Sequence, residues 1–176
     1  MDIEKTSKDE ERCTFHEKDA QEIVPKVWLG NAISAHNREF LDKNEIDYII
    51  NVTPDIQNKF NDKKYLHFHI RDQDTCVKDI KDIFDTSLHF MENALSKNKS
   101  VLVHCKRGHH RSASIIAAFL MKNIGVDYLS SMAYINNIRP CALRRNTCMV
   151  KGLFNYYLEC NGVKECNCTG QFCNHS

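Results

Sequence analysis

The chain lacks the features that mark membrane-spanning, exported and nucleic-acid-binding proteins. No apolar stretch approaches the roughly 18 consecutive residues that a membrane-spanning helix needs. The formal net charge of +1 at pH 7 gives no overall attraction to nucleic acid or to an anionic membrane. The N-terminus, MDIEKTSKDEER, mixes acidic and basic residues and has no apolar core of the kind found in signal peptides. We therefore expect no nucleic-acid partner, no membrane span and a cytoplasmic or nuclear location.

Cysteine is abundant, but its number does not suit a disulfide framework. Nine cysteines are present, so any full pairing leaves one thiol over. Without an export signal, we interpret them as reduced thiols, because the cytosol and nucleus keep thiols reduced. Cys160, Cys166, Cys168, Cys173 and His175 could together bind zinc, but the Cys-x-Cys spacing departs from the usual Cys-x2-Cys. We favour a flexible tail with exposed thiols and expect no metal and no cofactor.

The length and the polar ends predict one folded domain. A chain of 176 residues is long enough to bury a substantial core. Residues 1–20 are polar and are expected to be disordered. The folded domain is expected over residues 21–160, and the cysteine-rich tail over 161–176. The oligomeric state is left open.

Short apolar runs alternate with helical patterns, which indicates an α/β fold. The strands are expected at Glu22–Asn31, Asp47–Val52, Tyr65–Ile70 and Val101–Val103. Helices are expected at 32–44, from Ile80 to Leu95, at Ser112–Met121, after Asp127 as far as Arg139-Pro140, and from Val150 to Leu158. The helix from Ile80 has a clear apolar stripe at 3.6-residue spacing. Ile33, Phe40 and Leu41 are expected on the apolar side of the helix at 32–44.

The stretch Val101–Ser112 organises the chain. Its apolar start reads as a buried strand that ends on Cys105, and a short loop containing Gly108 then leads into a buried helix. This arrangement gathers backbone N–H groups and the positive end of a helix around one point, which suits a phosphate dianion and favours a cysteine thiolate. Arg111, six positions after the cysteine, can return to this point and offer two parallel N–H donors.

His104-Cys105-x5-Arg111-Ser112 resembles the signature of the cysteine-dependent protein tyrosine phosphatases, and the flanking residues are closest to the dual-specificity branch. Ile23–Gly30 is similar to the opening segment of that branch, and residues 136–146 are loosely similar to its Arg-x-Arg-Pro … Asn segment. The resemblance covers about residues 22–160. It implies a protein tyrosine phosphatase-like α/β domain with a central, mostly parallel, five-stranded sheet flanked by helices.

The resemblance also implies an enzyme and a mechanism that needs no metal. A thiolate of Cys105 would attack the phosphorus of a phosphotyrosine, phosphoserine or phosphothreonine in a protein substrate and form a phosphocysteine. Loop amides and Arg111 would stabilise the charge on the transferred group. The family places the general acid on the loop after the third expected strand, where either Asp72 or Asp74 could serve. We prefer Asp72, because it emerges directly from the strand, and keep Asp74 as the alternative.

The remaining loop residues refine the expected chemistry. In the family, the residue at His104 supports the loop and the thiolate, and the hydroxyl at Ser112 assists breakdown of the phosphocysteine. The expected phosphate-binding residues form an unusually basic loop, and they are Lys106, Arg107, Gly108, His109, His110 and Arg111. Basic loops also occur in related phosphatases of phosphoinositides and inositol pyrophosphates, so such substrates are an alternative. A simpler explanation of the basic loop is that Lys106, Arg107, His109 and His110 point outward and merely raise the local electrostatic potential. A non-catalytic phosphate-binding scaffold is a third function, which the intact Cys105 and Arg111 disfavour.

Overall fold

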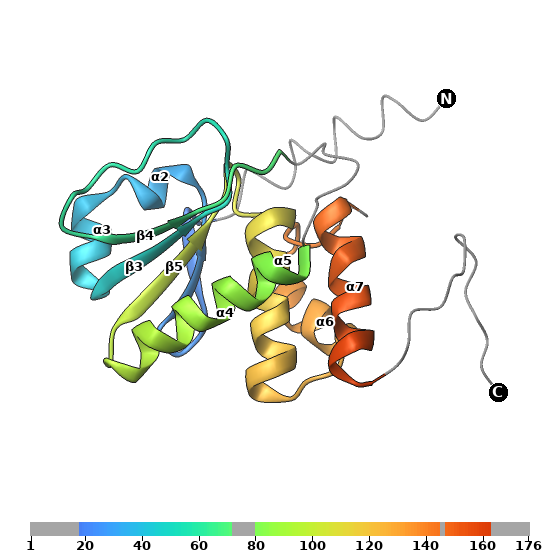
Figure 1. Cartoon of the computed structure of the whole chain (residues 1–176). Helices are drawn as coiled ribbons and strands as arrows, with labels where there is room; N and C mark the ends of the chain where they lie inside the picture. Colours follow the sequence, from blue (N-terminus) through green and yellow to red (C-terminus); the bar gives the residue numbers. More distant parts are fainter. Residues whose placement is uncertain (1–17, 72–79, 145–146, 163–176) are drawn as a thin grey trace, which may run out of the picture.

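Five strands form one sheet in the order β1-β2-β5-β3-β4, with β5 at its centre (Figure 1). Their bounds are β1 Ala20–Val24, β2 Val27–Gly30, β3 Ile46–Asn51, β4 Lys64–His67 and β5 Ser100–His104. Only the β1–β2 pair is antiparallel, and the other three pairs are parallel. The computed structural model describes residues 18–71, 80–144 and 147–162. The expected α/β domain with a mostly parallel, five-stranded sheet is therefore confirmed.

The first expected strand, Glu22–Asn31, is wrong as a single strand, because the chain reverses within it. β1 and β2 form a hairpin whose turn contains Pro25 and Lys26. Proline has no N–H to donate to a strand partner, and Lys26 adopts a left-handed backbone with φ +67°. The Lys26 N–H donates to Glu22 Oε1 at 2.7 Å, which stabilises the turn.

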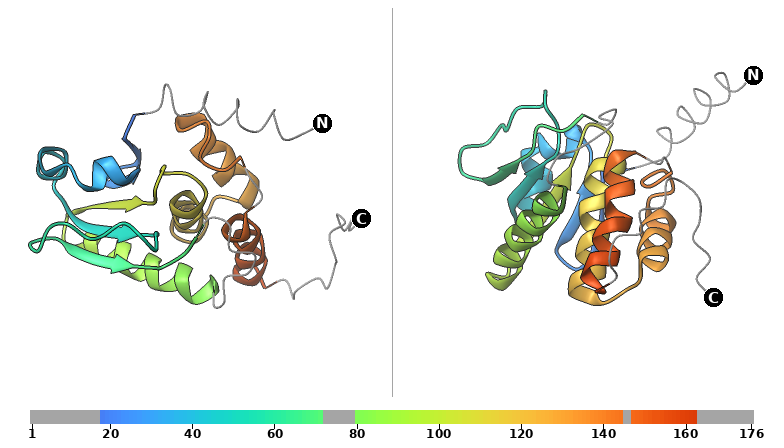
Figure 2. Two further views of the ribbon diagram at one scale, coloured as in Figure 1. Left: turned by 90° about the horizontal axis from the view of Figure 1, so that it is seen from above. Right: turned by 45° about the vertical axis from the view of Figure 1, so that its right-hand side comes forward.

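Helices cover both faces of the sheet (Figure 2). One face carries the larger helices, which are α4 Ile80–Ser96, α5 His110–Phe119, a π-helical turn η1 Leu120–Ile124, α6 Tyr128–Ile138 and α7 Cys148–Cys160. The other face carries α2 Ala32–Ala35 and α3 Arg38–Lys43. Alternate residues of β5 divide between the two faces: Val101 and Val103 pack with the larger group, and Leu102 packs with the smaller one. All of β5 is buried, as expected for a central strand.

The helix expected at 32–44 is wrong as one helix, because two asparagines start separate short helices. The side chain of Asn31 accepts a hydrogen bond from the Ser34 N–H, and that of Asn37 accepts one from the Phe40 N–H. Each asparagine thus supplies an N-cap, which favours a new helix start over continuation. The break leaves Ile33 63% exposed instead of on the expected apolar side.

The other expected elements are present with shifted ends. α4 and α7 correspond to the helices that were expected from Ile80 and from Val150, and both end slightly beyond the expected residues. The central helix starts at His110, earlier than expected, and its C-terminal continuation ends at Gly125 with φ +84°. Asp127 caps α6 through Ser130, as expected. β4 ends at His67, so the segment up to Ile70 is not strand. No helix among the described ranges has the length and hydropathy to cross a membrane.

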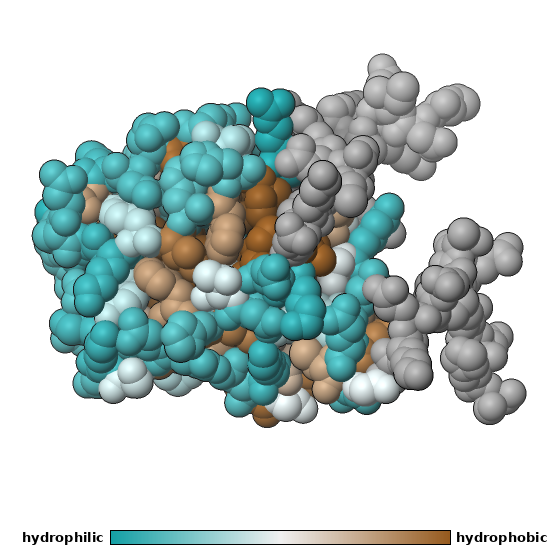
Figure 3. Space-filling model, in the orientation of Figure 1, coloured by the Kyte–Doolittle hydropathy of each residue, from teal (hydrophilic) through white to brown (hydrophobic). Residues whose placement is uncertain are grey.

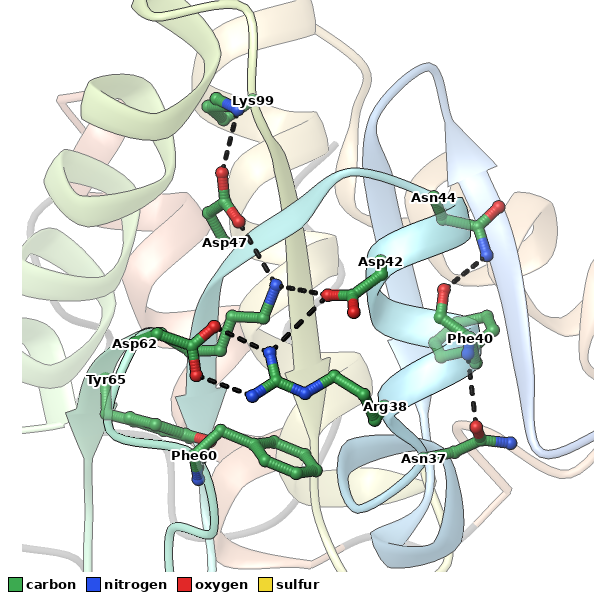
Figure 4. Close-up of polar contacts among 11 residues, drawn as sticks. Asn37, Arg38, Phe40, Asp42, Asn44, Asp47, Phe60, Asp62, Tyr65 and Lys99 are labelled. Carbon is green, nitrogen blue, oxygen red and sulfur yellow. Dashed lines mark hydrogen bonds and ion pairs between the residues drawn. The ribbon is translucent and has the colours of Figure 1, made fainter.

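An ion-pair network fastens α3 to the β4 edge of the sheet (Figure 4). Arg38 makes two hydrogen bonds to Asp62, at 2.6 and 2.8 Å. The buried ammonium of Lys63 lies 2.9 Å from Asp42 and 3.2 Å from Asp47. Because a buried charge is costly unless paired, the two carboxylates stabilise Lys63 in this position. The network therefore stabilises the outer part of the sheet, away from the central strand.

Cys105 and Cys160 carry free thiols. Cys141 is disulfide-bonded, so the expectation of reduced thiols is wrong at that position. The odd cysteine number excludes a complete pairing of the chain but not a single bond. The zinc alternative concerned residues that lie mostly in 163–176, outside the described ranges.

Candidate active site

The expected phosphate loop connects the carboxyl end of β5 to the start of α5. β5 lies between β2 and β3 (Figure 1), so Cys105 follows the carboxyl end of the central strand of the sheet. The cysteine is 2% exposed. α5 runs across the centre of the larger layer with every one of its residues buried. The loop is thus fixed at both ends by the most buried strand and the most buried helix of the described chain.

The sulfur of Cys105 lies beside two hydrogen-bond donors. The His109 N–H donates to Sγ at 3.4 Å, and the Ser112 hydroxyl lies 3.2 Å from Sγ. Ser112 Oγ is also 3.2 Å from the His109 carbonyl oxygen, so its proton can serve either acceptor. Both donors stand at the N-terminal end of α5, where the helix dipole favours negative charge. The Ser112 hydroxyl thus lies within hydrogen-bond distance of the Cys105 sulfur, as its expected role requires.

Gly108 is required by the backbone of the loop. Its φ is +70°, a conformation that residues with a side chain rarely adopt. A Cβ at this position would lie 2.6 Å from the carbonyl oxygen of Gly30, at the end of β2. The loop thus packs directly on the neighbouring strand, and only glycine fits both constraints.

Arg111 joins the loop to the segment that follows β4. Its Nη1 donates to the carbonyl oxygen of Ile70 at 2.9 Å, and the residue is 8% exposed. Ile70 precedes the two candidate acids, Asp72 and Asp74, which lie outside the described residues. The contact brings together the two parts of the chain, 41 residues apart, that the expected chemistry needs.

The four further basic residues of the loop divide into two pairs. Lys106 and Arg107 are exposed, whereas His109 and His110 are buried at 8% and 6%. The suggestion that all four side chains simply point outward is therefore wrong for the two histidines. They lie at the N-terminus of α5, in the tightly packed part of the loop, where burial orders their rings.

The ring of His104 is buried behind the cysteine. It is 1% exposed, and burial lowers the pKa of His104 to about 4, while a hydrogen bond with the Cys105 backbone opposes this shift. The imidazole is therefore neutral near pH 7. A neutral, buried ring suits the expected supporting role better than proton transfer to a substrate.

The lowered pKa of His104 predicts a specific loss of stability in acid. The His104 ring takes up a proton near pH 6.5 in the unfolded chain, but only near pH 4 in the folded chain. The neutral ring therefore contributes fully to the free energy of unfolding above pH 6.5, and this contribution is lost as the pH falls towards 4. We expect the loss to be about 3 kcal/mol in the free energy of unfolding. Urea unfolding at pH 7 and pH 4.5 should show a smaller pH effect in His104→Asn than in the wild type. Equal pH effects in the two proteins would contradict the assignment.

His67 and His69 contact the loop that follows β3. His67 and His69 stack with ring centroids 4.2 Å apart. His67 Nε2 lies 2.7 Å from the Thr53 carbonyl oxygen, and His69 Nδ1 lies 3.4 Å from that of Pro54. Within the described ranges, no group of three His, Cys, Asp or Glu side chains could hold a metal ion. We therefore place these rings in the support of the loop that follows β3.

Sequence reasoning missed one residue of the site, Arg139. The residues Arg139-Pro140 were interpreted as the end of a helix and as part of a segment loosely similar to the family's Arg-x-Arg-Pro … Asn segment, and no role in the site was assigned to Arg139. In the structure, the Arg139 guanidinium is 1% exposed and donates to the carbonyl oxygens of Arg107 and Gly108, both at 2.8 Å. The available signal was an arginine between an apolar helix end and a proline. Arginine is rarely buried without a polar partner, so an arginine in an apolar context indicates a buried polar contact.

Comparison with known proteins finds a matching family model and similar proteins. The family model described as "Dual specificity phosphatase, catalytic domain" matches residues 27–158. The dual specificity protein phosphatase Mpk3 of Drosophila melanogaster is 37% identical over 123 residues, which are 68% of this chain and 29% of that protein. The chain thus spans less than a third of the length of Mpk3.

Two solved structures share the fold. Human DUSP28 has a TM-score of 0.76 at 22% identity, over 82% of this chain and 97% of that chain. PTPMT1, solved in complex with PI(5)P, has a TM-score of 0.66 at 21% identity, over 82% of this chain and 98% of that chain. At these identities the two structures support the fold alone.

Proposed function

The chain belongs to the dual specificity phosphatase family, and we propose that it hydrolyses phosphate monoesters on tyrosine and on serine or threonine of a protein substrate. The observation that carries the proposal is the surroundings of Cys105. A buried sulfur, next to a backbone N–H and a hydroxyl at a helix N-terminus, is a nucleophile held where an anion is stabilised. An inert structural cysteine has no need of these donors.

The reaction proceeds in two steps, formation and hydrolysis of the phosphocysteine. In the first, the Cys105 thiolate forms a bond to phosphorus as the bond to the substrate oxygen breaks, and the acid, Asp72, gives that oxygen its proton. In the second, a water attacks the phosphocysteine, the same carboxylate takes the water's proton, and the thiolate leaves. Ser112 donates to the departing sulfur, and Arg111 binds the oxygens of the transferred group throughout.

Support for Asp72 comes from the anchoring of the preceding segment. The Ile70 carbonyl is fixed by Arg111, and Ile70 itself is 5% exposed. Asp72 follows this anchor by two positions in the sequence and Asp74 by four, so fewer rotatable backbone bonds separate Asp72 from it. The proposal therefore keeps Asp72 as the acid and Asp74 as its alternative.

A second candidate function is hydrolysis of an inositol phosphate or phosphoinositide by the same machinery. It is favoured by the exposed Lys106 and Arg107, which add positive charge next to the nucleophile. PTPMT1, which shares the fold, was solved in complex with PI(5)P, and this supports the second candidate. A non-catalytic scaffold is disfavoured, because binding alone requires no nucleophile.

A substrate panel tests the proposal directly. Purified protein is assayed for phosphate release from phosphotyrosine and phosphothreonine peptides, soluble inositol phosphates and phosphoinositides in mixed micelles. We expect kcat/KM for the phosphopeptides to exceed that for the inositol compounds by at least tenfold. The reverse order would favour the second candidate, and no release from any substrate by the wild type would favour the scaffold.

A further inference from the structure

Arg139 lies behind the phosphate loop and uses most of its donors on backbone carbonyls. It follows the last residue of α6, and its guanidinium is almost entirely buried. Nε donates to the Gly108 carbonyl oxygen, and Nη2 donates to that of Arg107, each at 2.8 Å. Nη1 donates to the Lys18 carbonyl oxygen at 2.7 Å and to Gln21 Oε1 at 2.6 Å. One side chain therefore connects the loop to the start of the described chain.

These contacts fix the direction of the loop's N–H groups. In a trans peptide, the C=O of one residue and the N–H of the next point in opposite directions. Because Arg139 holds the Arg107 and Gly108 carbonyls towards itself, the N–H groups of Gly108 and His109 point away from it. The His109 N–H indeed donates to the sulfur of Cys105. Arg139 and the Cys105 sulfur thus lie at opposite edges of the peptide group that joins Gly108 to His109.

The neighbouring carbonyls of the loop are held in the same manner. The Lys106 carbonyl oxygen accepts from the Ala32 N–H at 3.3 Å, and the His109 carbonyl oxygen accepts from the Ala113 N–H at 2.9 Å. These two donors belong to helices whose backbones are already fixed. At the middle of the loop, where Gly108 provides freedom at φ +70°, the Arg107 and Gly108 carbonyl oxygens accept from the side chain of Arg139.

Gln21 orients the guanidinium. Its Oε1 accepts from Arg139 Nη1, and its Nε2 donates to the Ile138 carbonyl oxygen at 3.0 Å. Both ends of this amide are used, so the side chain has one preferred orientation. Gln21, on the edge strand β1, thereby orients the Arg139 side chain that contacts the phosphate loop.

We propose that Arg139, oriented by Gln21, is a positioning residue that holds the middle of the phosphate loop with its N–H groups directed at the bound anion. The proposal rests on the proposed function, since it concerns how the same site binds phosphate. Arg139 touches neither the substrate nor the reacting atoms. Its effect is on the backbone donors that stabilise the thiolate and the transferred group.

The test measures the loop without requiring turnover. Cys105 is alkylated with iodoacetate at a series of pH values, with and without inorganic phosphate, and its modification is followed by peptide mass spectrometry. In Arg139→Met we expect the pH midpoint of alkylation to rise, and the phosphate concentration that gives half protection to rise about tenfold or more. In Arg139→Lys, which keeps one charged donor, both changes should be smaller.

Tyr134→Phe is the matched control. The Tyr134 hydroxyl lies on the same helix, α6, and donates to the carbonyl oxygen of Ile23 in the same strand, β1, at 2.9 Å, but it makes no contact with the loop. We expect its loss to leave both alkylation measurements unchanged. A role of Arg139 in stability alone would lower the melting temperature of Arg139→Met while its folded form kept the wild-type midpoint and phosphate protection, and that result would overturn the proposal.

Gln21→Ala provides a second route if Arg139→Met does not fold. It removes the orienting amide but leaves the arginine in place, so we expect a smaller change in the same direction as in Arg139→Met. Wild-type values in both Gln21→Ala and Arg139→Lys would overturn the proposal. If the wild type releases phosphate from no substrate yet its alkylation is protected by phosphate, the proposed function fails while the positioning test still stands.

Discussion

Cys105→Ser is expected to lower turnover of a phosphotyrosine peptide by about 10⁴-fold or more. A serine hydroxyl retains nearly the same volume but is not ionised at neutral pH, so no anionic nucleophile is available. The two donors to the sulfur and the Arg111 side chain are unchanged, so the protein should still fold and bind inorganic phosphate. Steady-state kinetics give the turnover, and calorimetric titration with inorganic phosphate gives the binding.

Cys160→Ser is the control for this experiment. Cys160 also carries a free thiol, but it is exposed at the end of α7, away from the loop. We expect its replacement to leave turnover within a factor of two. Residual activity of Cys105→Ser within tenfold of the wild type would remove Cys105 from its role as nucleophile.

The second large effect concerns the general acid and depends on the leaving group. A proton on the departing oxygen matters for a poor leaving group such as tyrosine, but matters little for a strongly acidic phenol. General acid catalysis contributes about 10²–10⁴-fold. We therefore expect Asp72→Asn to slow release from a phosphotyrosine peptide by that factor, to spare an activated aryl phosphate, and to flatten the alkaline limb of the pH–rate profile.

Asp74→Asn is the matched variant, because it removes the same charge from the same segment. We expect it to change neither substrate's kcat/KM by more than a few-fold. If Asp74→Asn shows the dependence on the leaving group and Asp72→Asn does not, then Asp74 is the acid. Equal losses on both substrates in both variants would instead indicate that the segment contributes to binding.

Apolar side chains are exposed on part of the protein surface. On the face shown in Figure 3, polar side chains cover most of the surface, and apolar ones are exposed near its middle. The exposed Ile33 lies on α2, whose Ala32 N–H contacts the loop at the Lys106 carbonyl. An exposed apolar residue therefore belongs to a helix whose first residue contacts the expected phosphate loop.

Local patterns in the chain were sufficient for most of the fold. The apolar run Val101–Val103 predicted the central strand, because a strand covered on both faces needs apolar residues at every position. The 3.6-residue stripe after Ile80 predicted α4, and Asp127 predicted the start of α6, because both signals lie within a few residues of their effect. The hairpin at Pro25-Lys26 and the break at Asn37 were missed, since single residues decided them against the surrounding pattern.

The sequence by itself placed Cys105 and Arg111, the proposed nucleophile and phosphate-binding arginine, because Cys105, Gly108, Arg111 and Ser112 lie within one strand–loop–helix unit whose geometry follows from their spacing. Only the tertiary structure decided what supports that unit. The Arg139 contacts to Gly108 and Lys18 join residues 31 and 121 positions apart, and the Arg111 contact to Ile70 joins residues 41 positions apart. Such contacts depend on how helices and strands pack across the sheet, and no short-range pattern of residues records that packing.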